Sequence, residues 1–422
     1  MKKISCVLAA VIICMLTLDN SLSWGGETDI LIKKLVEKKI LSPSEANELL
    51  IEIQKEDRKQ REEVQEIAIK TAKETSHEVT ELPEWIKNTK IKGDLRLRYQ
   101  YEDTDNDGNP TRDRYRIRLR AGIESGINDQ FKVGFGLATG GDDPRSTNET
   151  LDNTFDSPDV RLDYAYAQYK PVKWLTAWGG KFKNPIWKTK DMLWDSDIRP
   201  EGIAATLKHE IGSAEIFFTP AFFILDEYKA DKDDPYMFAF QLGSKFKFLD
   251  NMYFKIAGSY YDFEHIKGNS LDHSAETNTV DSEGNLAEEY ESFALDAEYG
   301  IKFDGPVPFA ALFGQYVNSD ADREDEGYLA GLKLGLKKVK KLWDWQVKYN
   351  YRDLEKDAWL DTFPDSDFYG GATGVKGNEI EFKLGLAKHV TFGIDYYFDV
   401  ESQDGGSNKE QDLLQADLVL KW

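Results

Sequence analysis

The chain of 422 residues is strongly acidic, because 76 Asp and Glu outnumber 54 Lys and Arg and leave a formal net charge of -22. A chain of this charge is repelled by phosphate backbones, so the composition argues against nucleic acid as a partner. The mean hydropathy is -0.56, and beyond the N-terminal segment no apolar run approaches the roughly eighteen residues of a membrane helix, which excludes helical membrane spans.

The first residues have the pattern of a secretory signal. Two lysines precede an apolar run that ends at Leu18, and Ser21 and Ser23 follow at the spacing of a cleavage site. We therefore expect a signal peptide over residues 1–23. Both cysteines of the chain lie in this segment, so the exported protein would contain no disulfide.

Residues 24–85 predict a helical, periplasmic extension. Ser42 is placed as a helix cap, with Glu45 three residues later, and a long charged segment follows. Its apolar positions fit a heptad seam that Asp57 and Gln60 interrupt. Two interpretations stay open, a solvated spacer and an oligomerising coiled coil.

From about residue 90 onward the sequence alternates with a period of two, which predicts β-strands. The clearest stretch is "RDRYRIRLR" at residues 112–120, where five arginines share one face and Tyr115, Ile117 and Leu119 share the other. With the strand that precedes this one, about sixteen antiparallel strands are expected. The later ones lie near 130–139, 159–170, 174–183, 202–210, 214–224, 237–247, 252–263, 290–303, 307–317, 327–338, 343–352, 378–387, 391–399 and 411–422.

The connections between these strands alternate between short and long. Turns such as "PVK", "IGS" and "KHV" are followed by loops such as "HIKGNSLDHSAETNTVDSEGNLAEE". A bacterial outer-membrane barrel has this order, with the short turns on the periplasmic side, whereas a soluble sandwich has no reason for it. Aromatic residues near strand ends, among them Tyr164, Tyr166 and Tyr169, fit the interfacial girdles of such a barrel. We therefore predict a transmembrane β-barrel over residues 86–422.

Four segments carry a family resemblance: "LIKKLVEKKILSPSEANELL", "IKGDLRLRYQY", "YAYAQYKPVKWLTAWGGKFKNPIW" and the terminal aromatic Trp422. Together they resemble the putative porins of Gram-negative outer membranes, over essentially the whole chain. The resemblance implies a sixteen-stranded barrel, commonly a homotrimer, in contact with outer-membrane lipid and lipopolysaccharide. It also implies that small hydrophilic solutes or ions cross the outer membrane through the barrel by passive diffusion, and that the barrel-assembly machinery recognises Trp422.

In the resembling porins, the loop after the fifth long strand folds inward and narrows the channel. The corresponding segment here is "KFKNPIWKTKDMLWDSDIRPEG", and an ordinary surface loop is the alternative. The charged residues that it would bring to a constriction are Lys188, Lys190, Asp191, Asp195, Asp197, Arg199 and Glu201.

The arginine stripe is the second candidate for a channel site. If the polar face of each strand lines the lumen, its side chains form a basic ladder that attracts anions and faces water. The members are Arg96, Arg98, Arg114, Arg116, Arg118 and Arg120. The alternative is that they pair with lumen acids such as Asp94, Asp163 and Glu102 and leave no net field.

An enzyme is not expected, because the five histidines are scattered and no GxSxG, HExxH or CxxC motif occurs. The sequence predicts no cofactor and no metal. Residues 103–108 match the opening of an EF-hand loop, but Arg114 stands at the position of its bidentate Glu, so a complete EF-hand is rejected. Weak binding of a divalent ion and a solvated acidic hairpin tip stay open as alternatives. We therefore predict an outer-membrane porin with a modest anion preference; the alternative is an adhesive or structural barrel whose lumen is blocked.

Overall fold

The computed structural model describes residues 84–104, 111–229, 233–403 and 409–422, and scattered residues between 34 and 59. The chain divides into two units, Met1–Pro83 and Glu84–Trp422. In the first unit, Ser42 N donates to Glu45 Oε2 at 2.8 Å and Glu45 N donates to Ser42 Oγ at 3.3 Å, which is a reciprocal capping box. The expected signal peptide and most of the proposed heptad seam lie outside the described residues.

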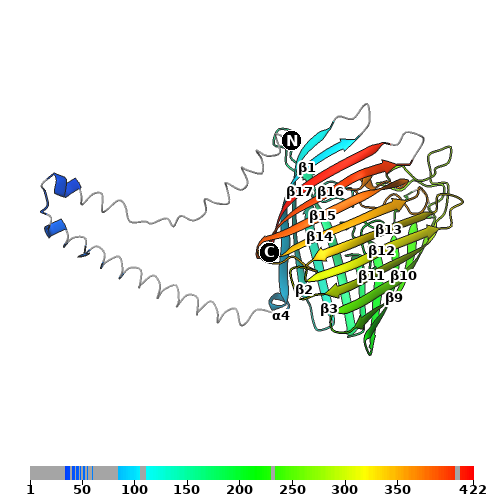
Figure 1. Ribbon diagram of the computed structural model, residues 1–422, viewed down its shortest axis with the longest axis horizontal. Helices are drawn as coiled ribbons and strands as arrows, with labels where there is room; N and C mark the ends of the chain where they lie inside the picture. Colours follow the sequence, from blue (N-terminus) through cyan, green and yellow to red (C-terminus); the bar gives the residue numbers. More distant parts are fainter. Residues whose placement is uncertain are drawn as a thin grey trace. The chain divides into compact units, whose positions relative to one another are not determined.

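Sixteen long antiparallel strands form the second unit (Figure 1). They are β1 (Thr89–Thr104), β2 (Arg112–Gly126), β3 (Phe131–Thr139), β5 (Val160–Val172), β6 (Leu175–Lys181), β7 (Glu201–Ile211), β8 (Ala214–Ile224), β9 (Tyr236–Phe248), β10 (Met252–Glu264), β11 (Glu291–Lys302), β12 (Phe309–Ser319), β13 (Glu326–Gly335), β14 (Trp345–Leu354), β15 (Val375–Ala387), β16 (Val390–Ser402) and β17 (Glu410–Lys421). The short elements are α4 (Glu84–Lys87), β4 (Glu149–Thr150) and the 3₁₀ turn η2 (Tyr369–Gly371).

The sheet closes on itself, because β1 pairs with β2 on one side and with β17 on the other. The two-residue β4 pairs with β2 and does not separate β3 from β5. The predicted closed barrel of sixteen strands is thus confirmed. Several strand bounds differ by a few residues from those expected; Trp343, for example, expected in a strand, has a φ of 65° in the turn before β14. None of the described helices is long and apolar enough to span a membrane.

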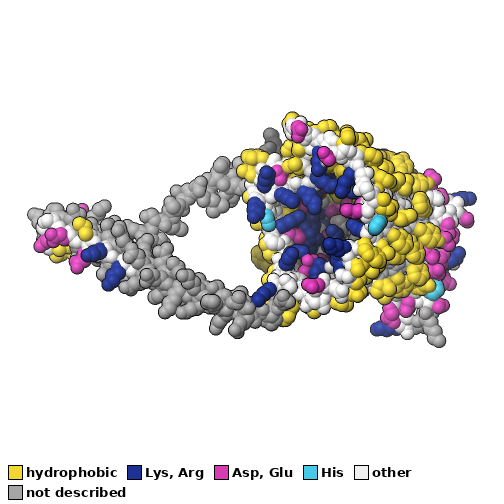
Figure 2. Space-filling model, turned by 90° about the horizontal axis from the view of Figure 1, so that it is seen from below, with side chains coloured by type: hydrophobic (Ala, Val, Ile, Leu, Met, Phe, Trp, Pro, Cys, Tyr) yellow, Lys and Arg dark blue, Asp and Glu magenta, His cyan; other side chains and the backbone are white. Residues whose placement is uncertain are grey.

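The alternation in sequence becomes an apolar outer surface and a polar inner one. In β1, the side chain of Leu97 is 44% exposed while that of its neighbour Arg98 is only 4% exposed, because successive residues point to opposite faces. The same contrast recurs around the ring, and hydrophobic side chains cover the outer wall in Figure 2. This outer surface is what a bilayer requires of a barrel.

Tyr164 and Tyr166 differ from the expected girdle, because both lie inside the barrel. A Cβ atom at Gly136 would be 2.3 Å from the Tyr164 ring, and one at Gly134 would be 2.7 Å from the Tyr166 ring. A register shift between β3 and β5 brings these tyrosines to the inner face, where the glycines leave room for the rings.

The seam of the barrel closes around Trp422. Gly93 N donates to Trp422 O at 3.2 Å and Trp422 N donates to Gly93 O at 3.1 Å. The indole packs so closely over Gly93 that a Cβ atom there would be 2.2 Å from Trp422 Cζ2. A residue without a side chain is therefore needed opposite the terminal aromatic.

Candidate functional site: the barrel interior

Residues 182–200, here called the inner loop, leave β6 and cross the interior of the barrel. Trp187 N donates to Gln241 Oε1 of β9 at 2.8 Å, and Gln241 Nε2 donates back to Trp187 O at 2.7 Å. Farther along, Thr189 N and Thr189 Oγ1 donate to Asp296 Oδ1 of β11 at 2.7 and 2.9 Å. Since the partners are inward-facing residues of distant strands, the loop lies within the ring.

The tip of the inner loop is anchored by ion pairs to β14 and β15. Arg352 of β14 lies 2.6 Å from Glu379 and 3.2 Å from Asp191, while Lys190 lies 2.7 Å from both Glu379 and Glu381. Burial alone would raise the pKa of Asp191, but Lys190 and Arg352 outweigh this effect and lower the pKa to about 2. The Lys190 pKa is raised well above its ordinary value by Asp191, Glu379 and Glu381, against the effect of burial.

A second loop, residues 355–374 between β14 and β15, packs against the inner loop. Trp359 is fully buried and donates Nε1–H to Leu193 O at 2.7 Å, and the rings of Trp194 and Phe363 lie 4.8 Å apart. These side chains belong to a hydrophobic cluster that also includes inward residues of β7 to β14. Sequence reasoning missed this partner; the apolar residues in "AWLDTF", within an otherwise acidic loop, were the available signal.

Asp195 connects the two loops through its carboxylate. Asp197 N donates to Asp195 Oδ1 at 2.7 Å, and Ser366 N donates to Asp195 Oδ2 at 3.0 Å. Burial, followed by the charge of nearby Asp197, raises the pKa of Asp195 to about 8. The pKa of Asp197 is lowered instead, because Arg118, Arg120 and Arg96 together outweigh its burial.

The arginines of the proposed ladder all project inward, and most of them meet carboxylates. The measured pairs are Arg98–Asp417 at 2.7 Å, Arg98–Asp367 at 3.3 Å, Arg96–Asp417 at 3.5 Å, Arg118–Asp94 at 2.7 Å, Arg120–Asp94 at 2.9 Å and Arg120–Asp197 at 3.1 Å; Arg114 pairs with Glu102. Arg116 instead donates to Gln100 Oε1 at 3.2 Å and to Asn148 O at 3.3 Å, with no ion pair to any described residue.

Two sequence expectations change with this geometry. Arg98 and Arg118 are 4% and 7% exposed, so the expectation that the whole ladder faces water is wrong for these two. Asp94 and Glu102 do pair with the ladder, as the alternative proposed, whereas Asp163 lies 3.8 Å from Arg199 of the inner loop. Neighbouring carboxylates therefore offset much of the stripe's charge.

Two further charged residues of the predicted segment, Lys188 and Glu201, have contacts of their own. Lys188 is turned back on the loop, where Nζ donates to Trp194 O and to Asp195 O, and burial lowers its pKa. Glu201 is the first residue of β7 and lies 2.6 Å from Lys181 at an exposed position. These two side chains thus do not join the contacts of the loop tip.

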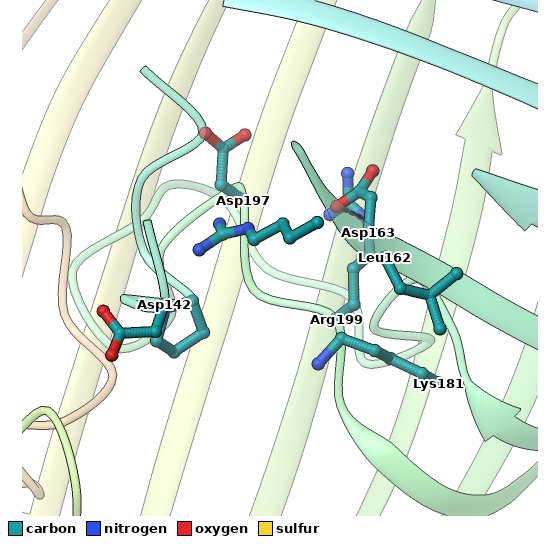
Figure 3. Close-up of a pocket in the computed structure, with 8 residues that line it drawn as sticks. Asp142, Leu162, Asp163, Lys181, Asp197 and Arg199 are labelled. Atoms are coloured by element: carbon teal, nitrogen blue, oxygen red, sulfur yellow. Dashed lines mark ion pairs between the residues drawn. The ribbon is translucent and has the colours of Figure 1, made fainter. Parts of the chain in front are cut away.

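A hollow of about 180 Å³ lies where the inner loop meets β5 and the loop after β3 (Figure 3). Side chains of both charge signs line it. They are Asp142, Pro144, Arg161, Leu162, Asp163, Lys181, Asp197 and Arg199. The hollow offers mixed charge and no concentration of either sign.

Two groups of carboxylates in the described part of the chain are close enough to share an ion. They are Asp191, Asp365 and Glu379, and Glu379, Glu381 and Asp395. Lys190 and Arg352 already bind these oxygens, and Lys348 and Lys383 lie 2.9 and 2.8 Å from Glu381. Protein cations thus occupy the places that a metal would take.

Lysines form a second basic region, which sequence reasoning did not single out. Figure 2 shows Lys and Arg side chains surrounding a hollow at one mouth of the barrel. Inward lysines of β9, β10 and β13 contribute to this interior, and several lie over aromatic rings. Their signal in the sequence was the alternation of "SKFKF" and "LKLGLKK".

Comparison with known proteins places this geometry in a family. A family model described as a putative porin matches residues 101–297 and 289–422, which is more than half of the chain. The chain belongs to the putative porin family. This confirms the resemblance seen in the sequence and identifies the barrel as that of a porin channel.

Solved structures of other porins are similar to this porin. The high-pH structure of Pseudomonas putida OprB has a TM-score of 0.54 at 10% identity, covering 80% of this chain and 95% of that one. Salmonella typhi OmpF, in a complex with daunomycin, has a TM-score of 0.47 at 12% identity, covering 79% and 97%. At 10% sequence identity, the similarity to OprB is a similarity of fold alone. No curated protein sequence matches the chain significantly.

Proposed function

We propose that this protein is an outer-membrane porin through which small hydrophilic solutes and ions diffuse passively. The observation that carries the proposal is a closed barrel with an apolar outer face and a charged interior, crossed by an inner loop that is fixed at both walls. Size exclusion by the loop and the charges of the wall would then decide which solutes pass.

Several features of the proposal come from the sequence. The signal peptide over residues 1–23 would direct export, residues 24–85 would form a periplasmic extension, and the barrel would occupy residues 86–422. Outer-membrane lipid and lipopolysaccharide would surround a homotrimer, and Trp422, at the seam of β1 and β17, would serve as the signal for barrel assembly.

A modest anion preference is also part of the proposal. Neighbouring carboxylates offset much of the arginine ladder, so we assign the preference to Arg116 together with the inward lysines. Fixed cationic groups in a narrow aqueous space raise the local concentration of anions.

The packing of the loops favours one alternative, a barrel whose lumen is blocked and whose acidic loops bind a partner. The loop at residues 355–374 and the inner loop share a buried hydrophobic cluster inside the ring. An enzyme is not proposed: in the part of the chain that the structure describes, His209 lies in β7, His389 lies in the turn after β15, and only His265 and His273 share a loop.

Single-channel recording in a planar bilayer tests the proposal. Discrete conductance steps from the purified, folded protein are expected. A protein that migrates as a folded barrel yet gives no steps would exclude the diffusion channel and favour the blocked, adhesive barrel.

A further inference from the structure

Four lysines gather on the inner wall formed by β9 to β13; they are called the lysine cluster here. Lys245 of β9, Lys255 of β10 and Lys333 of β13 project inward, and Lys337 follows β13. The ammonium groups of Lys245 and Lys337 lie 4.6 and 4.5 Å from the centre of the same ring, that of Tyr253. A cation of β9 and a cation that follows β13 are thus held beside one aromatic side chain.

The aromatic contacts extend across the cluster. Lys255 Nζ lies 4.0 Å from the Trp187 ring of the inner loop and 4.8 Å from the Phe217 ring, while Lys333 Nζ lies 5.8 Å from the Phe313 ring. Rings attract an ammonium group without neutralising it, so they position the lysines and leave their charge available.

Carboxylates offset little of this charge. Glu298 accepts a hydrogen bond from Tyr253 OH at 2.6 Å and lies 3.5 Å from Lys333. Lys245, Lys255 and Lys337 form no ion pair with any residue in the described ranges. Glu215 of β8 lies opposite Lys245 in the strand register but pairs with Lys208 at 3.8 Å, so four lysines face two carboxylates, in contrast to the arginine ladder.

The cations also lie close enough to influence one another. Burial lowers the pKa of Lys337, and the charges of Lys245, Lys333 and Lys302 lower it further, although Glu298 acts in the opposite direction. Such mutual repulsion is relieved when an anion binds between the lysines. An anion with several charges relieves more of it than chloride does.

We propose that the lysine cluster is a binding site for multivalent oxyanions, such as phosphate compounds, within the channel. Each ammonium group offers up to three N–H donors, so one oxyanion can accept from two or more lysines at once. The inference deepens the proposed diffusion function, because it names the class of solute that the channel would retain longest.

Calorimetric titration of the full-length protein in uncharged detergent with pyrophosphate tests this site directly. The wild type is expected to bind pyrophosphate. The double variant K245Q/K337Q should have a dissociation constant at least about tenfold higher, because two charge-assisted hydrogen bonds are lost. The matched control is K132Q/K170Q, which removes one lysine from β3 and one from β5, away from the lysine cluster, and should keep the wild-type affinity. Heat-dependent mobility on gels verifies that every variant is folded.

Equal weakening by both double variants, or no pyrophosphate binding by the folded wild type, would overturn the site. The readout does not depend on conduction, so it separates the two proposals. Pyrophosphate binding by a barrel without conductance steps would support the site and refute the diffusion channel. Conductance without pyrophosphate binding would leave the channel and refute the site.

Discussion

Arg352 and Arg116 both project into the barrel, yet their surroundings give them different roles. Arg352 lies within 3.4 Å of Asp191, Asp365 and Glu379, and its guanidinium lies 4.2 Å from the Phe368 ring. Arg116 has only neutral hydrogen-bond acceptors at the distances measured. One arginine joins several buried carboxylates, and the other carries a charge that no described carboxylate pairs.

Replacing Arg352 by Leu should therefore destabilise the barrel. Glu379 is fully buried and would keep only Lys190 as a charged partner, so we expect a loss near 3 kcal/mol, at the lower end for a broken buried ion pair. Urea unfolding in micelles measures this loss in the free energy of unfolding. K376Q, which removes a pair with Glu401 on more exposed residues, should change stability by less than about 0.5 kcal/mol. Equal stability of R352L and the wild type would show that the interior network contributes nothing.

Asp195 should make stability depend on pH. Its pKa of about 8 in the folded protein exceeds the usual value near 4, so the folded state binds a proton that the unfolded state releases. Stability from this group is greatest at or below about pH 4, falls as the pH rises to about 8, and is then constant. The slope is at most about 1.4 kcal/mol per pH unit.

Unfolding titrations of D195N between pH 5 and 9 check this linkage. The amide cannot ionise, so the variant should lose Asp195's share of the slope, while Asp365, whose pKa burial also raises, retains its own. An unchanged slope in D195N would mean that Asp195 is ionised across the whole range.

At the scale of elements, two loops and several strands depend on one another. The inner loop contacts β9, β11, β14 and β15, and residues 355–374 cover it. Asp361 of that covering loop accepts hydrogen bonds from Ser274 Oγ at 2.8 Å and Thr277 N at 2.7 Å, which lie in the loop after β10. The position of the inner loop is therefore set by contacts remote in sequence.

The seam between β1 and β17 gives an element-scale prediction. Valine at Gly93 would collide with the Trp422 indole and with Arg120 O, which lies 2.5 Å from the Cβ position. We expect a loss of about 1–3 kcal/mol from overpacking, measured as a lower temperature of conversion from the folded to the unfolded gel band. The control G141A, where a Cβ meets nothing within 4 Å, should behave as the wild type. If G93V converted at the same temperature as the wild type, the Trp422 indole would be able to move away from residue 93 without loss of stability.

On the scale of the whole molecule, acidic residues are concentrated in two long loops, one of which enters the barrel, where Asp365 pairs with Arg352 and Asp367 with Arg98. Residues 265–290 contain six acidic residues and one lysine, and residues 355–374 contain five acidic residues and one lysine. The inner wall carries the arginine stripe and the lysine cluster. The interior thus holds both signs of charge, and the lysine cluster and Arg116 are its cations with the fewest described ion pairs.

Reversal potentials in a KCl gradient should accordingly show a modest preference for anions that decreases as salt rises. R116Q should reduce this preference and change stability by about 1 kcal/mol or less, because it breaks no ion pair. R98Q is the comparison: it leaves Asp417 with Arg96 at 3.5 Å and should cost more stability. A cation-selective wild type would show that the inner-loop carboxylates control permeation instead.

Deletion of residues 24–83 tests the proposed extension. The barrel unit begins at Glu84, so the shortened protein, with its export signal kept, should still fold into a heat-modifiable barrel. If the extension oligomerises, the trimer should dissociate at a lower temperature, measured by native gel electrophoresis. An unchanged dissociation temperature would favour the solvated spacer.

The sequence by itself determined the barrel, its sixteen strands and, apart from exceptions such as Tyr164 and Tyr166 of β5, the side of a strand that faces inward. These properties follow from local rules, since a period of two fixes the faces of a strand, and the order of short and long connections fixes the topology. The inward orientation of Arg96 and Arg116 could be deduced in this way. Only the tertiary structure decided their partners.

Asp417 reaches Arg98 from more than three hundred positions away, because closure joins the last strand to the first. The inward turn of Tyr164 depends on a register shift, and the lysine cluster depends on side chains from β9, β10 and β13 converging across the curvature of the ring. Contacts of this kind depend on ring closure and packing, and no repeating pattern in the sequence indicates them. The charge that a solute meets inside the barrel is therefore a property of the fold.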